Sequence, residues 1–278
     1  MIRATALILV LLAAPVFAGE EPTAKEMFDA GQASLAKGQF EDAAKAFKAA
    51  AKLEPDNKAY TGRAMILVRV LRARKYVETA EVDAKWEKVA TSLHEFYVRE
   101  GLLENAVTLD RKMYEGRPSA RTASLLAETL LETGKNAEAE KHLAGLSKDH
   151  KYLQNRVYEG IALARTGKKD EAKKLAAGLE IPADTRSGIL YDLARLQTLI
   201  GETEKNLATL TKCFENLPEK SQAPLREMAK KCPDFQAIAA TEPFAKALAT
   251  KSKVKESDCS GGSGCGSCPS RDSCGSDK

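Results

Sequence analysis

Four cysteines near the C-terminus have the residue type and spacing best suited to chemistry in this sequence. They are Cys259, Cys265, Cys268 and Cys274, in the pattern C-x5-C-x2-C-x5-C. Four thiolates can surround one zinc or cuprous ion, because four sulfur ligands complete a tetrahedral site. The central pair has the spacing of a redox-active dithiol. Metal binding and thiol redox chemistry are therefore both candidate activities of this end of the chain.

The segment that carries these cysteines favours a plainer interpretation. Residues 251–278 are dominated by Gly, Ser and charged residues, and Val254 is the one aliphatic side chain among them. Such a segment cannot bury enough apolar surface to fold alone, so we expect a flexible tail. Structural zinc sites usually pair two C-x2-C knuckles on ordered hairpins, and this segment has a single knuckle. Local disulfides or a covalent attachment site are the simpler alternative to a zinc or copper site.

The rest of the chain offers no arrangement that predicts catalysis. The Gly-Lys steps at residues 134–135 and 167–168 look like the end of a phosphate-binding loop. Neither has the required glycine five residues earlier, and neither has Ser or Thr after the lysine. The three histidines have no metal-ligand spacing to one another or to a cysteine; they are His94, His142 and His150. We therefore expect a protein that is not an enzyme and holds no cofactor, apart from any metal bound by the tail.

The N-terminus has the features of a secretory signal peptide. Arg3 gives a basic start, residues 4–12 are apolar, and Ala18 supplies the small residue that a signal peptidase needs. The apolar run is shorter than the ~20 residues that span a bilayer, and no lipid-attachment cysteine follows it. We expect cleavage after residue 18 and an exported protein, periplasmic or secreted, without a stable membrane anchor.

Export would place the remaining cysteines, Cys213 and Cys232, in an oxidising compartment. They lie about one helix apart in the sequence. They could be bridged across neighbouring helices or stay as separate buried thiols, because a disulfide forms only where the two sulfur atoms meet. The sequence leaves both alternatives open.

The charge balance argues against two classes of partner. The chain has 43 basic and 39 acidic residues, a net charge of +4, and the predicted signal peptide removes one of the basic residues. A balance this even does not favour nucleic acid or an anionic membrane surface as a partner.

Five glycines recur at a near-regular spacing along the chain. They are Gly38, Gly101, Gly134, Gly167 and Gly201, and the last four are 33, 33 and 34 residues apart. A period of this size is typical of arrays of helix–turn–helix units. The glycine allows a left-handed turn between two helices, and small residues on either side of it let the helices approach closely.

This register resembles the tetratricopeptide repeat over about residues 24–220. The best copy carries Met27, Gly31, Gly38, Phe40, Ala43, Phe47, Ala50 and Pro55. The resemblance implies an all-α fold, an α-α superhelix of the solenoid kind, over residues 19–250. Capping helices would close its C-terminal end through Phe235, Ile238, Phe244 and Leu248.

Residues 58–86 fit the register least well. We expect a degenerate repeat there, with a turn near residues 72–75 and a shortened partner helix. Trp86 would then be a packing residue where two segments meet, and its alternative role is a platform on which a ligand stacks.

The resemblance also implies where a partner would bind. In this family the first helix of each unit lines a concave groove, and side chains two and six positions before each turn glycine face the partner. With a tyrosine one turn further back in two units, the groove candidates are Glu95, Arg99, Glu128, Glu132, Tyr158, Arg165, Tyr191 and Arg195. The set is acidic in the middle and basic toward its end, which would suit a peptide that is basic and then acidic. On this hypothesis Arg165→Glu with Arg195→Glu weakens partner capture without unfolding the protein.

The resemblance therefore implies a non-catalytic scaffold of the cell envelope or the extracellular space, with a protein or peptide partner in the groove. The alternative is a metal-binding or thiol-redox protein that acts through the four tail cysteines.

Overall fold

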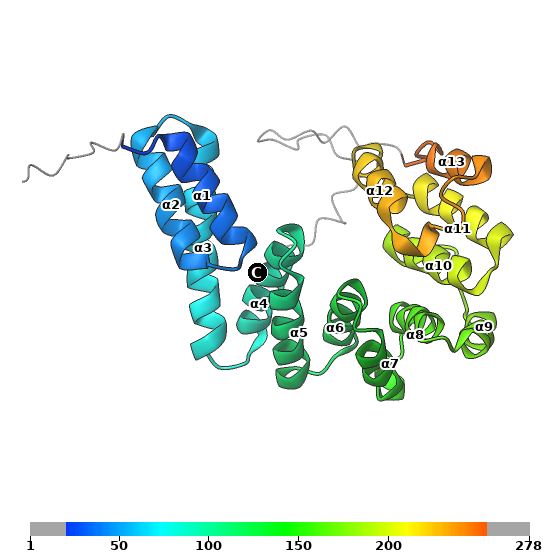
Figure 1. Ribbon diagram of the computed structural model, residues 1–278. Coiled ribbons are helices and arrows are strands. Elements are labelled where there is room, and N and C mark those ends of the chain that lie inside the picture. The colour runs from blue at the N-terminus through cyan, green and yellow to red at the C-terminus, as the bar shows by residue number, and fades with distance from the viewer. Residues whose placement is uncertain (1–20, 255–278) are drawn as a thin grey trace, which may run out of the picture. The chain divides into compact units, whose positions relative to one another are not determined.

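The computed structural model describes residues 21–254, and all regular structure in that range is helical (Figure 1). The all-α helical-repeat class expected from the sequence is confirmed. The predicted signal peptide and the four tail cysteines lie outside the described residues. No helix within residues 21–254 is long and apolar enough to cross a membrane. The chain divides between Leu102 and Leu103 into two compact units, which are described in turn.

The first unit begins with a helix pair, α1 (Ala24–Ala36) and α2 (Phe40–Leu53), that fits the best copy of the repeat. Gly31 lets the two helices approach closely, since a Cβ atom on it would lie 2.8 Å from the ring of Phe47. One face of α2 is buried against its neighbours through Phe40, Ala43, Phe47 and Ala50. The spacing of these apolar positions is that of a helix with a single buried stripe.

The prediction of a turn near residues 72–75 is wrong. A single helix, α3 (Lys58–Thr79), runs through this stretch, and α4 (Ala84–Arg99) follows after a short break. Residues 72–75 are Arg, Ala, Arg and Lys, which all favour helix, and no glycine or proline stops α3 there. Trp86 is fully buried at the start of α4, and its indole Nε1 donates a 3.1 Å hydrogen bond to the carbonyl of Val77. The prediction that Trp86 is a packing residue is confirmed.

Arg63 of α3 joins three helices of the first unit. Its guanidinium donates two hydrogen bonds to the carboxylate of Glu100, the residue that caps α4, one of them 2.9 Å long. A third bond of 3.2 Å goes to the side chain of Gln32 on α1. Both charged side chains are largely shielded from water, so their attraction is screened less than that of a surface pair.

We expect Glu100→Gln to flatten the acid dependence of this unit's stability. Hydrogen bonds from Arg63 hold the pKa of Glu100 below its usual value of 4.5. Glu100 therefore stabilises the folded state above that pH, and this contribution is lost as pH falls through the folded-state pKa. At pH 7 the variant should lose about 1–2 kcal/mol of unfolding free energy.

Urea unfolding followed by tryptophan fluorescence tests this prediction, because Trp86 is the one tryptophan in the chain and lies in this unit. The difference between the wild-type protein and the variant should shrink as the pH is lowered from 7 toward 3. A difference that stays constant over this range would contradict the assignment.

The second unit continues the alternation of helices (Figure 1). The first helices α6, α8 and α10 pack side by side, with α8 touching both α6 and α10, and each also packs against the helix that follows it. The elements are α5 (Leu103–Gly116), α6 (Ala120–Glu132), α7 (Asn136–Ala144), η1 (Lys148–His150), α8 (Leu153–Arg165), α9 (Lys169–Ala177), α10 (Ser187–Ile200), α11 (Thr203–Glu215), α12 (Glu219–Lys231), η2 (Pro233–Phe235) and α13 (Glu242–Leu248).

The turn glycines behave as the register predicts. All five have φ between 71° and 86°, a left-handed conformation that strains residues with a side chain. At Gly201 the chain leaves α10, and the amide of Glu202 returns a 2.8 Å hydrogen bond to the carbonyl of Gln197. This bond satisfies one of the carbonyls that a helix end leaves without a partner.

The C-terminal segment closes the last helix pair through an aromatic cluster. Phe235 of η2 is fully buried, with its ring centroid 5.6 Å from that of Tyr191 and 5.4 Å from that of Phe244. Ile238 and Leu248 belong to the same buried cluster, so all four residues expected to cover this end are buried there.

Cys213 and Cys232 are buried free thiols in this cluster, not a disulfide. Burial raises the pKa of the Cys213 thiol to about 12. The Cys213 sulfur also lies 3.2 Å from the carbonyl oxygen of Ser187, to which the thiol donates. Both cysteines therefore act as small core residues.

Candidate partner-binding groove

The second unit has a groove across the first half of three neighbouring first helices. We call it the α6–α8–α10 groove, and it has a volume of about 880 Å³. Its lining comes from α6, α8 and α10 and the residues just before them: Ala120, Arg121, Ser124, Leu125, Glu128, Tyr152, Leu153, Gln154, Tyr158, Arg186, Gly188, Ile189 and Asp192. A depression of this size can hold several side chains of an extended peptide.

The groove lining combines apolar and cationic side chains. Leu125 and Ile189 are partly exposed, and Tyr152 is 64% exposed, which is unusual for a large aromatic side chain. Arg121 on α6 and Arg186 at the start of α10 are both exposed. Exposed aromatic and arginine side chains are the groups that most often dominate the energetics of an interface.

A buried amide fixes the start of α8 against α6. Asn155 is fully buried and accepts a 2.6 Å hydrogen bond from the hydroxyl of Ser124. Its amide nitrogen donates to the carbonyls of Ala120 and His150. Because these bonds hold the first turn of α8 in place, they also position Tyr152 at the edge of the groove.

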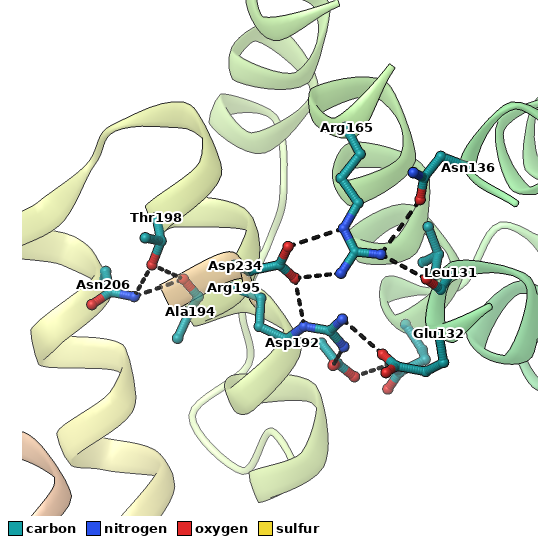
Figure 2. Close-up of polar contacts among 11 residues, drawn as sticks. Leu131, Glu132, Asn136, Arg165, Asp192, Ala194, Arg195, Thr198, Asn206 and Asp234 are labelled. Atoms are coloured by element: carbon teal, nitrogen blue, oxygen red, sulfur yellow. Dashed lines mark hydrogen bonds and ion pairs between the residues drawn. The ribbon is translucent and has the colours of Figure 1, made fainter. Parts of the chain in front are cut away.

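Two arginines and three carboxylates form an ion-pair network beside the groove (Figure 2). Asp192, Arg195 and Asp234 are largely buried in it, whereas Glu132 lies at its exposed edge. Arg165 of α8 donates two hydrogen bonds, of 2.9 and 2.8 Å, to the carboxylate of Asp234 in η2. Arg195 of α10 donates to Asp234 at 2.8 Å, to Asp192 at 3.0 Å and to Glu132 at 2.8 Å. Asp234 thus bridges α8 and α10 through their arginines.

The pKa values of Asp192 and Arg195 in this network each depend on the charge of the other. Burial raises the pKa of Asp192, and the neighbouring guanidinium of Arg195 opposes that shift. Burial by itself would lower the pKa of Arg195, but Asp192, Glu132 and Asp234 together raise it above its ordinary value. Arg195 therefore stays charged, and its removal would leave three carboxylates with a single cation.

The predicted role of four groove candidates needs correction. Arg195, Tyr158 and Tyr191 are each 5% exposed or less, and Arg165 is held by Asp234. Asp234 of the C-terminal segment holds Arg165 and Arg195, Phe235 packs against Tyr191, and Tyr158 belongs to the buried core of this unit. Arg165→Glu with Arg195→Glu would place two further negative charges beside the carboxylates of the network, so the double variant should unfold this unit, contrary to the expectation from the sequence.

The other candidates are divided between the two units. Glu128 and Tyr158 line the α6–α8–α10 groove, although Tyr158 is nearly buried, and Glu132 lies outside it in the ion-pair network. Glu95 and Arg99 are exposed on α4 in the first unit. The structure therefore brings six of the eight candidates into one unit and places two in the other.

The prediction missed Arg121, Tyr152 and Arg186. The family register places contact residues near the second half of each first helix, whereas these three lie at or near its start. A signal was present in the sequence, since Tyr152 and Arg186 occupy positions where a helix usually begins with Ser, Thr, Asp or Asn.

A metal site is not found among the described residues. Within residues 21–254, no group of three or more His, Cys, Asp or Glu side chains is placed to hold an ion. The proposed ligands Cys259, Cys265, Cys268 and Cys274 lie outside that range.

Comparison with known proteins identifies the repeat. The sequence profile of the tetratricopeptide repeat matches residues 24–57. No curated protein matches the sequence significantly.

Three solved structures are similar to this chain. A tetratricopeptide repeat protein from Parabacteroides merdae has 16% identity and a TM-score of 0.42, over 81% of this chain and 97% of that one. TTC0263, a thermophilic tetratricopeptide repeat protein of Thermus thermophilus, has 18% identity and a TM-score of 0.39, over 74% and 98%. YrrB, a tetratricopeptide repeat protein with an unusual peptide-binding site, has 15% identity and a TM-score of 0.34, over 69% and 84%.

The matched residues are those that form α1, the turn at Gly38 and α2. Residues 24–57 are therefore a tetratricopeptide repeat, which confirms the family recognised from the sequence.

Proposed function

We propose that this protein is an exported, non-catalytic interaction module that binds a peptide segment of a partner protein in the α6–α8–α10 groove. The tetratricopeptide repeat is in general a protein-interaction fold without catalysis, which supports the class of function. The observation that carries the proposal is the groove itself, which three successive first helices line and in which Tyr152 is 64% exposed. Export rests on the signal-like sequence before residue 19.

The groove is suited to an extended segment. Its lining residues come from three neighbouring helices, so a chain that crosses them would meet a new set of side chains at each helix. The ion-pair network at Arg165 and Arg195 engages the end of α8 and the second half of α10. A partner segment is therefore confined to the first half of these helices.

Photo-crosslinking in cells tests the proposal. Benzoylphenylalanine is placed at Tyr152 in the groove or, as a control, at Met228, an apolar side chain of α12 that is 51% exposed and outside the groove. Protein-sized adducts are expected for position 152 and not for position 228. Equal adducts at both positions, or none at 152, would rule out the groove as the binding surface.

Cell fractionation tests the location. We expect the mature protein in the periplasm or the medium, with an N-terminus at Gly19. Recovery of the uncleaved chain from the cytoplasm would overturn this part of the proposal.

A further inference from the structure

We propose that the occupant of the α6–α8–α10 groove is an acidic segment, with an apolar side chain between two carboxylates. This inference rests on the proposed function and specifies the chemistry of the partner. It differs from the expectation of a peptide that is basic and then acidic, because that expectation counted charged side chains which the protein itself neutralises.

The charges that the groove offers to a partner are positive. Of the two acidic lining residues, Asp192 is bound by Arg195 and Gln154, and Glu128 is also engaged within the protein. Arg121 and Arg186 are exposed, and their side chains form no ion pair or hydrogen bond within residues 21–254. A partner that enters the groove therefore meets two unneutralised guanidinium groups, which bind carboxylates well.

The helix starts at the groove point to the same chemistry. At the starts of the first helices α1, α3, α4 and α6, a capping side chain accepts a hydrogen bond from a backbone amide of the first turn; these side chains are Thr23, Asn57, Asp83 and Ser119. The starts of α8 and α10 carry Tyr152 and Arg186, and neither side chain makes such a bond.

An arginine at a helix start opposes the helix dipole and leaves amide donors without a side-chain acceptor. Residues that break a local rule without a gain inside the protein are often functional. Here the missing acceptors and the added cation both favour an incoming carboxylate.

The spacing of these groups defines the length of the segment. The two arginines come from helices on either side of α8, at whose start Tyr152 lies, and Leu125 and Ile189 are on the same two helices as the arginines. Packed helices are about 8–10 Å apart, so the arginines stand roughly two such steps apart. An extended chain covers that span in about five or six residues. The two carboxylates should therefore flank an apolar residue at about this separation.

The protein's own C-terminal segment already uses this combination. Asp234 places its carboxylate on Arg165 and Arg195, and the next residue, Phe235, packs its ring edge-on against Tyr191. An acidic residue and an aromatic residue of the protein's own chain thus bind to α8 and α10, next to the open groove.

Fluorescence anisotropy with synthetic peptides tests the inference. The probe is a twelve-residue peptide with a central Phe-Leu pair and Asp and Glu on both sides, acetylated and amidated so that all its carboxylates are side chains. One comparison peptide has Asn and Gln in place of the acids, and another has Lys. We expect the acidic peptide to bind at least about tenfold more tightly than either, and added salt to weaken it.

Arg186→Asp separates binding from folding. It removes the cation and supplies a capping side chain to α10, so the variant should unfold at a higher temperature while its affinity for the acidic peptide falls about tenfold. Arg69→Glu, at an exposed position of α3, is the charge control and should leave binding unchanged. A preference for the Lys peptide, or unchanged affinity of Arg186→Asp, would overturn the acidic occupant.

The two proposals can fail separately. Crosslinks at position 152 together with equal binding of all three peptides would leave the groove function standing and remove the acidic specificity. The absence of crosslinks at position 152 would remove the groove function itself.

Discussion

Replacing Arg195 with alanine should lower the unfolding free energy of the second unit by about 3–5 kcal/mol, the range expected when one partner of a buried ion pair is removed. The Arg195 side chain is 6% exposed and is shared by Asp192, Glu132 and Asp234. Without it, Arg165 would be the one cation left for the three carboxylates of this network. Burying charge that is not neutralised is strongly unfavourable, and the native state would therefore be the state that loses stability.

Urea unfolding followed by circular dichroism measures this change. Arg111→Ala is the matched control, because Arg111 is also paired with a carboxylate, that of Glu138, but at the surface. The control should lose no more than about 1 kcal/mol. If the two variants were equally stable, the network would not be the structural element inferred here.

Phe235→Ala should lower the unfolding free energy of the second unit by a similar amount, about 3–5 kcal/mol, because it leaves a cavity where a fully buried ring was. Phe235 joins η2 to α10 through Tyr191 and to α13 through Phe244. Its loss should release the C-terminal segment before the rest of the unit unfolds. Limited trypsin digestion is the measurement, and early cleavage after Lys231 or Lys246 is the expected result.

Phe235→Leu serves as the control for this experiment. It keeps most of the apolar volume and should destabilise the segment less than alanine does. Should Phe235→Ala resist trypsin as well as the wild-type protein does, the closing segment would be held by other contacts.

The features of the fold that depend on residues close in the sequence could be predicted from the sequence. The turn glycines, the buried stripe of α2 and the buried aromatics of the closing segment follow from local spacing and propensity. The same reasoning failed at residues 72–75, because the register required a turn there whereas the residue types favour a continuous helix.

The candidate site was less predictable because its boundary is set by a distant segment. Arg165 and Asp234 are 69 residues apart, and no local pattern indicates that they meet. A groove assigned from the family register therefore included side chains that the chain itself covers. The open part of the groove could be recognised only once the covered part was known.

The bridge from Asp234 to α8 and α10 also bears on how such an array can change its length during evolution. Repeat proteins usually lengthen by duplicating a helix pair. An additional pair inserted between α11 and α12 would carry Asp234 away from Arg165 and Arg195 while leaving their charges behind. Lengthening at this end would therefore leave Arg165 without its carboxylate, take one of three carboxylates from Arg195 and open an apolar end at once. The array is expected to gain or lose units elsewhere along the chain and to keep its final two pairs as a fixed terminus.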